Sequence, residues 1–334
     1  MFNNIVRQIM NFFRMPGWKP RVAFLFMSGL VLLSVMFAHK IVNREVSELA
    51  SPTPTPQVRT VFGAYVGYHL DAMERFEDLV GQKTGAEMVF AHWGNDSEFP
   101  ISYASRVRDK KKTMVLFWEA IDYNRPLSDQ ADYSLDAITR GDHDEYIRRF
   151  ALGAQEYRGP IILIPFSEMN GNWFPWSGTA KGNSPEKIIA AYRHIRGFFR
   201  DAPNVKFGWA VNARDIPDEE GNRFELYYPG SDVVDVVGVD GFNYDGKEEV
   251  TFGQLFGSAL ERLQKFDKPI WIFSMGTAEE PTKPAWITDA LVNEIPKRPG
   301  IVGWLWFNEN KERDWRVDSS PASLSAFRDA VKGY

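Results

Sequence analysis

The sequence of 334 residues contains no cysteine, so it has no disulfide framework, no thiolate nucleophile and no zinc site built from cysteines. Thiol redox chemistry is excluded with them. Histidine is scarce as well: the five histidines, at positions 39, 69, 92, 143 and 194, show no paired ligand spacing. We therefore predict no metal and no cofactor.

The sequence also lacks an excess of positive charge. Its formal net charge is -5, and lysines and arginines are scattered along the chain rather than gathered in a stripe. Nucleic-acid binding depends on a basic field that attracts the phosphate backbone. Nucleic acid is therefore not a predicted partner.

Long hydrophobic runs are rare too, and the one that stands out is VAFLFMSGLVLLSVMFA, residues 22–38. An uncharged run of this length spans most of the ~30 Å hydrocarbon core of a bilayer. Positive residues are more frequent before it than after it, which by the positive-inside rule places residues 1–21 in the cytoplasm. A cleaved signal peptide is the alternative, but Met36-Phe37-Ala38 fits an A-x-A cleavage site poorly. We expect a retained transmembrane anchor with the following domain periplasmic or extracellular.

The stretch SPTPTPQ, residues 51–57, ends a predicted linker over residues 39–57 that carries proline and threonine. The remaining residues 58–334 have the size of one (β/α)8 barrel. Short apolar runs alternate there with amphipathic segments such as DEYIRRFALGAQEY, and SPEKIIAAYRHIRGFF opens with Ser184 as a good N-cap before Pro185. Eight runs are strand candidates, beginning at Val61, Met88, Thr113, Pro160, Val205, Val233, Pro269 and Ile301. A doubly wound sheet stays possible, but the absence of a glycine-rich phosphate loop favours an α/β fold closed into a TIM barrel.

Aromatic and polar side chains gather where these predicted strands end, which is the end that carries the chemistry of a (β/α)8 barrel. A sugar-binding cleft needs this mixture, because a pyranose stacks its apolar face on an aromatic ring and its hydroxyls need fixed donors and acceptors. We predict the following substrate-binding residues: His92, Trp93, Asn170, Trp173, Trp176, Asn212, Phe242, Tyr244 and Trp306.

Glu168 follows the fourth predicted strand within LIPFSEMNGNWFPWS. Apolar neighbours such as Phe166 and Trp173 would raise its pKa by desolvation, which suits a general acid. Strand position alone would equally fit a salt-bridged or loop-capping glutamate. The surrounding motif decides between these interpretations.

SEMNGNWFPWSG resembles the fourth-strand signature of glycoside hydrolase family 26, the β-mannanase and β-glucanase family of retaining barrel enzymes. Four further segments are similar to that family: ITRGDHDEYIRRFA, ELYYPGSDVVDVVGVDGFNY, KPIWIFSMGTAE and GWLWFNENKERDWRVDSS. The resemblance covers the chain from about residue 61 onward. It implies that Glu168 is the acid/base, that Trp173 contacts sugar and that a β-linked mannan or glucan is the ligand.

The resemblance also implies a loss. The family nucleophile is a glutamate at the end of the seventh strand, where this sequence has Ser274. Ser167 replaces the histidine before the acid/base, and Phe242 replaces the tyrosine that would hydrogen-bond the nucleophile. A retaining glycosidase needs two carboxyl groups ~5 to 5.5 Å apart, so retaining hydrolysis should fall by several orders of magnitude.

Two hypotheses follow. The protein is a membrane-tethered, non-hydrolytic or weakened member of the family that handles a β-glycan, as an accessory to synthesis or export and with a glycosyltransferase or export complex as partner. Alternatively, it is an active endo-β-glycosidase with a rearranged second carboxylate. Asp240, Glu119 and Glu309 are the candidates for this carboxylate. Glu279 and Glu280 lie beyond the strand end, where exposed loop charges are a better interpretation than a displaced nucleophile.

Overall fold

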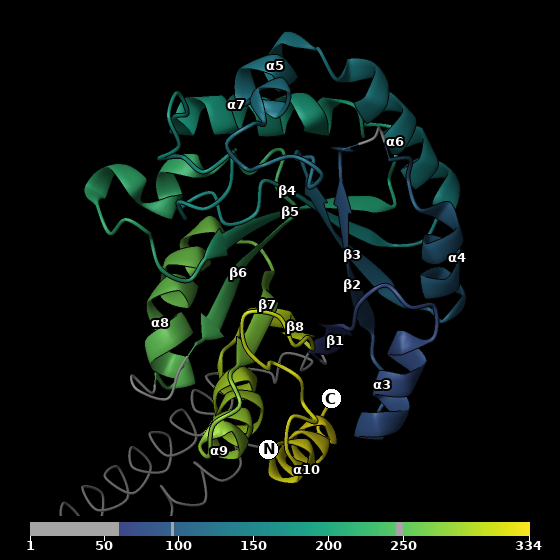
Figure 1. Ribbon diagram of the computed structural model, residues 1–334, viewed down its shortest axis with the longest axis vertical. Helices are drawn as coiled ribbons and strands as arrows, with labels where there is room; N and C mark the ends of the chain where they lie inside the picture. The colour runs from purple at the N-terminus through teal and green to yellow at the C-terminus, as the bar shows by residue number, and fades with distance from the viewer. Residues whose placement is uncertain (1–59, 95–96, 245–249) are drawn as a thin grey trace, which may run out of the picture. The chain divides into compact units, whose positions relative to one another are not determined.

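The computed structural model describes residues 60–94, 97–244 and 250–334, which belong to one compact unit, Arg59–Tyr334. Eight parallel strands close into a barrel in which each strand pairs with the next and β8 pairs with β1. In Figure 1 helices surround these strands. The predicted TIM barrel is confirmed.

The strands follow the eight apolar runs of the sequence. They are β1 (Val61–Tyr65), β2 (Ala86–His92), β3 (Thr113–Glu119), β4 (Ile161–Pro165), β5 (Val205–Asn212), β6 (Val236–Asn243), β7 (Ile270–Thr277) and β8 (Ile301–Phe307). The helices of the described unit are α3 (Ala72–Val80), α4 (Ile101–Asp109), α5 (Leu135–Arg140), α6 (Asp144–Tyr157), α7 (Pro185–Gly197), α8 (Phe252–Leu263), α9 (Lys283–Thr288) and α10 (Pro321–Val331).

Local signals in the sequence set several helix boundaries. Ser184 caps α7 by accepting a hydrogen bond from the amide of Lys187, and Pro185 occupies the first turn, as the sequence predicts. Thr251 and Gln254 form a reciprocal capping box at the start of α8. The connection from β5 to β6 differs from the simple alternation, because it contains two 3₁₀ turns, Glu220–Asn222 and Phe224–Tyr227, and no α-helix.

The core has two layers, and alternate residues of each strand enter different layers. One set fills the barrel interior, for example Met88, Phe117 and Phe273. The other set packs between the strands and the helices, where Trp118 and Trp209 lie. A side chain at the end of a strand therefore reaches the mouth of the barrel only when it belongs to the interior set.

The predicted membrane anchor, residues 22–38, and the cytoplasmic segment and linker on either side of it lie outside the described residues. Within the described ranges, no helix combines the length and the apolar character that crossing a bilayer requires.

Candidate functional site at the barrel mouth

Glu168 lies in the loop that follows β4, and the local backbone holds it in an unusual conformation. Both Phe166 and Glu168 have positive φ angles, 55° and 53°. A left-handed conformation at a residue other than glycine costs about 1–3 kcal/mol and persists only where surrounding contacts fix it. Here the amide of Glu168 donates to the carbonyl of Ala210 on β5 at 2.9 Å. The loop is thereby tied to the neighbouring strand.

Trp173 forms a hydrogen bond to the carboxylate of Glu168. Its indole Nε1 donates to Glu168 Oε2 at 2.9 Å, and 36% of its surface is exposed. Gly171 leaves room for this ring, because a Cβ atom there would come within 2.5 Å of Trp173 Cζ2. The motif NGNW thus combines a required glycine with an exposed aromatic surface beside a carboxyl group.

Burial raises the pKa of Glu168 to about 7, although the hydrogen bond from Trp173 and the positive charge of Lys311 both favour the carboxylate. A carboxyl group with this pKa exchanges its proton readily at neutral pH. Glu168 therefore has the properties of a general acid or base.

Asp240 and Ser274 face each other on adjacent strands. Their Cα positions are register partners between β6 and β7, and both side chains are buried. The register shifts between Val239 and Asp240, so Phe273 is an extra residue on β7. This bulge returns Ser274 to the interior set, although strict alternation would place it with Ile272 on the helix side.

Asp240 is an uncompensated buried carboxyl group. Neither of its oxygens has a hydrogen-bond partner among the described residues. Burial raises its pKa well above the usual range, and the negative charge of Glu168 raises it further. Asp240 therefore keeps its proton under conditions in which an exposed aspartate is charged.

This burial predicts a pH-dependent stability. From about pH 4 upward an unfolded chain releases the Asp240 proton and the folded protein retains it, so stability contributed by protonated Asp240 is lost as pH rises. We expect Asp240→Asn to flatten the decline in melting temperature between pH 5 and pH 8, and to be more stable than the natural protein at pH 8 by about 1–3 kcal/mol. Asp201→Asn, at an exposed position, is the matched control. Parallel melting curves for the natural protein and Asp240→Asn would contradict the assignment.

Glu119 is a third carboxyl group at the mouth. It ends β3, is buried, and accepts a hydrogen bond from Tyr123 at 2.9 Å. Burial raises the pKa of Glu119 to about 7, and the negative charge of Glu168 raises it further. The hydrogen bond from Tyr123 and the positive charge of Lys311 act in the opposite direction. The positive charge of Lys311, in the loop after β8, therefore acts to lower the pKa of both Glu119 and Glu168.

The structure brings several predicted ligand contacts to this mouth. His92 is the register partner of Glu119, and its ring lies edge-on to Tyr123 with 5.5 Å between centroids. Asn212 is the register partner of Asp240. Phe242 packs on Trp315 with 5.0 Å between centroids, and Tyr244 is half exposed.

Four other predicted contacts lie in the core instead. Trp93 and Trp306 are at most 1% exposed and belong to the layer between barrel and helices. Trp176 is buried and donates to the carbonyl of Ser167, and Asn170 is completely buried. None of these side chains presents a surface on which a sugar ring could stack, so the structure gives them packing and positioning roles.

Asn170 shows what such a role means. Its side chain donates to the carbonyl of Asn212 at 2.9 Å and accepts from the amide of Asn212 at 2.8 Å. It also donates to Asp215 Oδ1 at 2.9 Å. Asn170 therefore joins the loop that carries Glu168 to the end of β5.

Tyr123 and Lys311 are not among the residues predicted from the sequence, and Glu119 and Asp240 are predicted there only as alternatives. Period-two alternation could have found both carboxyl groups, since Glu119 follows the interior residue Phe117 by two positions. Tyr123 and Lys311 belong to loops, and their sequence neighbourhoods give no comparable signal.

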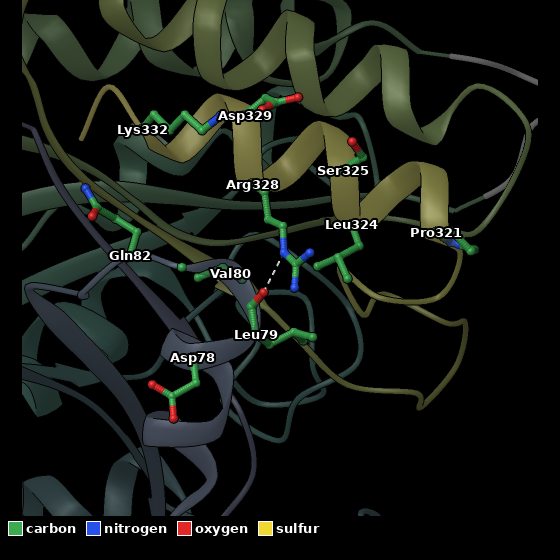
Figure 2. A pocket seen from close by; sticks show the side chains of 11 residues that line it. Asp78, Leu79, Val80, Gln82, Pro321, Leu324, Ser325, Arg328, Asp329 and Lys332 are labelled. Atoms are coloured by element: carbon green, nitrogen blue, oxygen red, sulfur yellow. Dashed lines mark hydrogen bonds and ion pairs between the residues drawn. The ribbon is translucent and has the colours of Figure 1, made fainter.

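A hollow of about 520 Å³ lies on the outer surface between the end of α3 and α10 (Figure 2). Arg328 crosses it and donates to the carbonyl of Leu79 at 2.7 Å. Its lining residues come from these two helical segments and include none of the carboxyl groups above. Elsewhere too, the described ranges contain no group of three or more side chains suited to hold a metal ion.

Comparison with known proteins gives this site a context. The chain is 34% identical to Endoglucanase H of Acetivibrio thermocellus over 281 residues, which cover 80% of this chain and 30% of that protein. It is 24% identical to a mannan endo-1,4-beta-mannosidase of Bacillus subtilis over 168 residues, 47% of this chain and 43% of the relative. The chain thus spans less than half of the length of either relative.

The fold is shared with solved mannanases. A Bacillus subtilis mannanase superposes with a TM-score of 0.58 at 16% identity, over 83% of this chain and 86% of that one. The catalytic domain of a Bacillus sp. endo-beta-1,4-mannanase gives 0.61 at 17% identity, over 82% and 86%. The family model described as Glycosyl hydrolase family 26 matches residues 117–289, more than half of the sequence. The chain belongs to glycosyl hydrolase family 26.

Proposed function

We propose that the barrel binds a β-linked glucan at its mouth and does not cleave it by the retaining mechanism. One observation supports the proposal: Ser274 and Asp240 are buried register partners on β7 and β6, and burial and the charge of Glu168 favour the protonated form of Asp240, whereas a retaining enzyme needs a charged carboxylate as its second group. A serine hydroxyl without a base to activate it is a poor nucleophile. Glu168 can still donate a proton, but of the described residues neither Ser274 nor protonated Asp240 supplies a charged attacking carboxylate.

Glucan is favoured over mannan as the ligand class. The 34% identity to a protein named as an endoglucanase exceeds the 24% identity to a protein named as a mannosidase. The half-exposed rings at the mouth, those of Trp173, Tyr244 and Tyr123, suit stacking on glucose units, whose ring hydrogens are all axial.

The binding proposal predicts a large effect of Trp173. We expect Trp173→Ala to weaken the affinity for cello-oligosaccharides and mixed-linkage β-glucan about 10-fold or more, because it removes an exposed aromatic surface. Trp173→Phe should lose less affinity, since it keeps a ring and removes only the donor to Glu168. Isothermal titration measures both. Failure of the natural protein to bind any of these glucans, or β-mannan, at millimolar concentration would overturn the proposal.

The competing proposal is slow hydrolysis with a rearranged carboxylate. The observation in its favour is that Glu119, Glu168 and Asp240 meet at one mouth and that the charge of Glu168 acts on both others. It is weaker because burial favours the protonated form of Asp240, which neither attacks nor accepts a proton, and because the carboxylate of Glu119 already accepts a hydrogen bond from Tyr123. New reducing ends released from β-glucan, and lost in Glu168→Ala, would favour it.

Membrane attachment is a further part of the proposal and rests on the apolar run of residues 22–38. A tethered barrel of this kind would hold a β-glucan outside the membrane as synthesis or export machinery delivers it, with a glycosyltransferase as the partner. We expect deletion of residues 22–38 to move the protein from the membrane to the soluble fraction. An unchanged membrane fraction would show that the anchor lies elsewhere.

A further inference from the structure

The end of the barrel opposite the mouth, where the strands begin, carries a cluster of cations that glucan binding at the mouth does not use. The cluster comes from the loops that lead into β3, β4 and β5 and from the start of β5 itself. We call these residues the basic face: Arg108, Lys110, Lys111, Arg158, Arg200 and Lys206. All six are exposed, although the chain as a whole has a net charge of -5. This face therefore differs in sign from the average of the protein.

Hydrogen bonds hold the contributing loops side by side. Arg108 donates to the carbonyl of Tyr157 at 2.9 Å, which joins the end of α4 to the end of α6. The side chain of Asn204 donates to the carbonyl of Gly159 at 2.9 Å, which joins the loop before β5 to the loop before β4. The cations thus lie on one continuous surface.

Most of the basic face has no counter-ion. Arg108 and Lys110 each have a carboxylate partner, with nitrogen–oxygen distances of 3.2 and 3.5 Å. The other four cations have no ion-pair partner anywhere in residues 60–94, 97–244 and 250–334. Glu156 and Asp201 are exposed at the same end, but the cations outnumber these carboxylates. The surface is therefore available to an anionic partner.

The backbone shows that positive charge is placed here at a cost. Lys111 and Arg158 lie just after helices and have φ angles of 59°, a conformation for which glycine is usual. Attraction to the C-terminal end of a helix favours a cation nearby. That attraction does not explain Lys206, which is the register partner of the interior residue Ile162 and is exposed where β5 begins.

The loops at the mouth have the opposite charge. Acidic residues outnumber basic ones in the loops after β3 and β5, and their exposed acidic residues include Asp129, Asp132, Asp218, Glu219 and Glu220. An anionic surface therefore attracts the end where the strands begin and repels these loops. Such a surface would orient the barrel as well as bind it.

We propose that the basic face docks on the anionic headgroups of a phospholipid bilayer and holds the barrel with its mouth directed away from the membrane. The inference rests on the proposed membrane attachment, because a few exposed cations attract a bilayer only weakly and need a second anchor. The chain enters β1 at the end of the barrel that carries the basic face, and the predicted anchor, residues 22–38, precedes β1 in the sequence. A bilayer is therefore favoured over a soluble polyanion.

The absence of cysteine permits a site-specific test with the full chain in lipid nanodiscs. A dye is attached at Gln155→Cys, an exposed position of α6 near the basic face, or at Ser128→Cys, an exposed position in the loop after β3. Energy transfer to a rhodamine-labelled lipid reports how close each position lies to the bilayer. With phosphatidylglycerol present, we expect more transfer from position 155 than from position 128. The difference should vanish in pure phosphatidylcholine and in about 0.5 M sodium chloride.

Charge variants test whether the basic face is responsible. Lys111→Gln with Lys206→Gln should lower the ratio of docked to undocked barrel about 10-fold or more, because each cation near an anionic bilayer adds to the attraction. Lys181→Gln with Arg214→Gln is the matched control, since it removes the same charge from exposed positions in loops at the mouth. The control should leave transfer from position 155 unchanged.

The outcomes separate docking from the proposed function. Equal transfer from the two positions in phosphatidylglycerol bilayers, or unchanged transfer in Lys111→Gln with Lys206→Gln, overturns docking and leaves membrane attachment standing. A chain that associates with neither kind of bilayer overturns both. Binding of soluble polygalacturonate that the double variant loses, without any effect of phosphatidylglycerol, would assign the basic face to an anionic polysaccharide and overturn docking. Titration with cellotetraose measures glucan binding independently of all three results.

Discussion

The double variant Ser274→Glu, Phe242→Tyr is expected to hydrolyse β-glucan with retention, at a rate about 10²- to 10³-fold above that of the natural protein. A carboxylate at position 274 would supply an attacking group that the Ser274 hydroxyl does not provide. The pKa of Glu168, about 7, already suits the acid role. The tyrosine hydroxyl would donate to the new carboxylate from the interior face of β6.

The surroundings favour this outcome. Phe242 is the register partner of Gly276, and a Cβ atom at Gly276 would already lie 3.3 Å from its ring, so the ring position is closely fixed. The added glutamate would lie beside Asp240, whose raised pKa favours the protonated form that can donate to it. Release of reducing ends from mixed-linkage β-glucan measures the rate, and NMR of the first product reports its anomeric configuration.

The control for this prediction is Ser274→Gln with Phe242→Tyr, which keeps the shape of glutamate and removes its charge. It should remain inactive. If the glutamate variant folds, binds cello-oligosaccharides and still releases no reducing ends, the mouth differs from a retaining site in more than its nucleophile.

The second large expected effect concerns Asp215, a buried carboxylate that joins the loops behind the mouth. Oδ1 accepts from the Asn170 side chain at 2.9 Å and from the amide of Phe224 at 3.1 Å. Oδ2 pairs with Arg262 at 3.0 Å and with Arg223 at 3.4 Å. We expect Asp215→Ala to destabilise the fold by about 3–5 kcal/mol, because it leaves the buried amide of Phe224 unsatisfied and removes one of the two carboxylate partners of Arg262, the other being Glu225.

Chemical denaturation followed by tryptophan fluorescence measures this loss. The matched control is Asp232→Ala, which removes the exposed ion pair between Asp232 and Arg193 and should cost at most about 1 kcal/mol. Asp215→Asn keeps an acceptor for Asn170 and should fall between the two. Equal stabilities of Asp215→Ala and Asp232→Ala would show that the network does not hold the loops.

Asp215 also illustrates why part of the site escaped sequence analysis. The motif around Glu168 indicated the loop after β4, but nothing in it indicates that Asn170 would turn away from the mouth toward Asp215. That orientation depends on where the chain between β5 and β6 lies, and this segment contains two 3₁₀ turns and no α-helix. Contacts between residues more than 40 positions apart decide it.

The tryptophans are the clearest case. Their recurrence at predicted strand ends indicated a sugar cleft, and Trp173 does lie beside Glu168 with an exposed ring. The side chains of Trp93 and Trp306, however, lie on the same side of the sheet as those of Trp118 and Trp304, which pack between the barrel and the helices. Side-chain alternation separates the two groups, so this distinction was available from the sequence once each strand had a register.

The number of strands, their order and the position of Glu168 follow from the sequence, because apolar runs, helix caps and the fourth-strand motif are local patterns that retain their meaning in the folded chain. The direction in which the Ser274 side chain points does not follow from the sequence. Alternation along β7 would turn it toward the helices, and only the bulge at Phe273 places it opposite Asp240 inside the barrel. That bulge depends on pairing between strands, where one extra residue is accommodated by the closed sheet. The sequence therefore determined which residues are present at the mouth, and the tertiary structure decided which of them face one another.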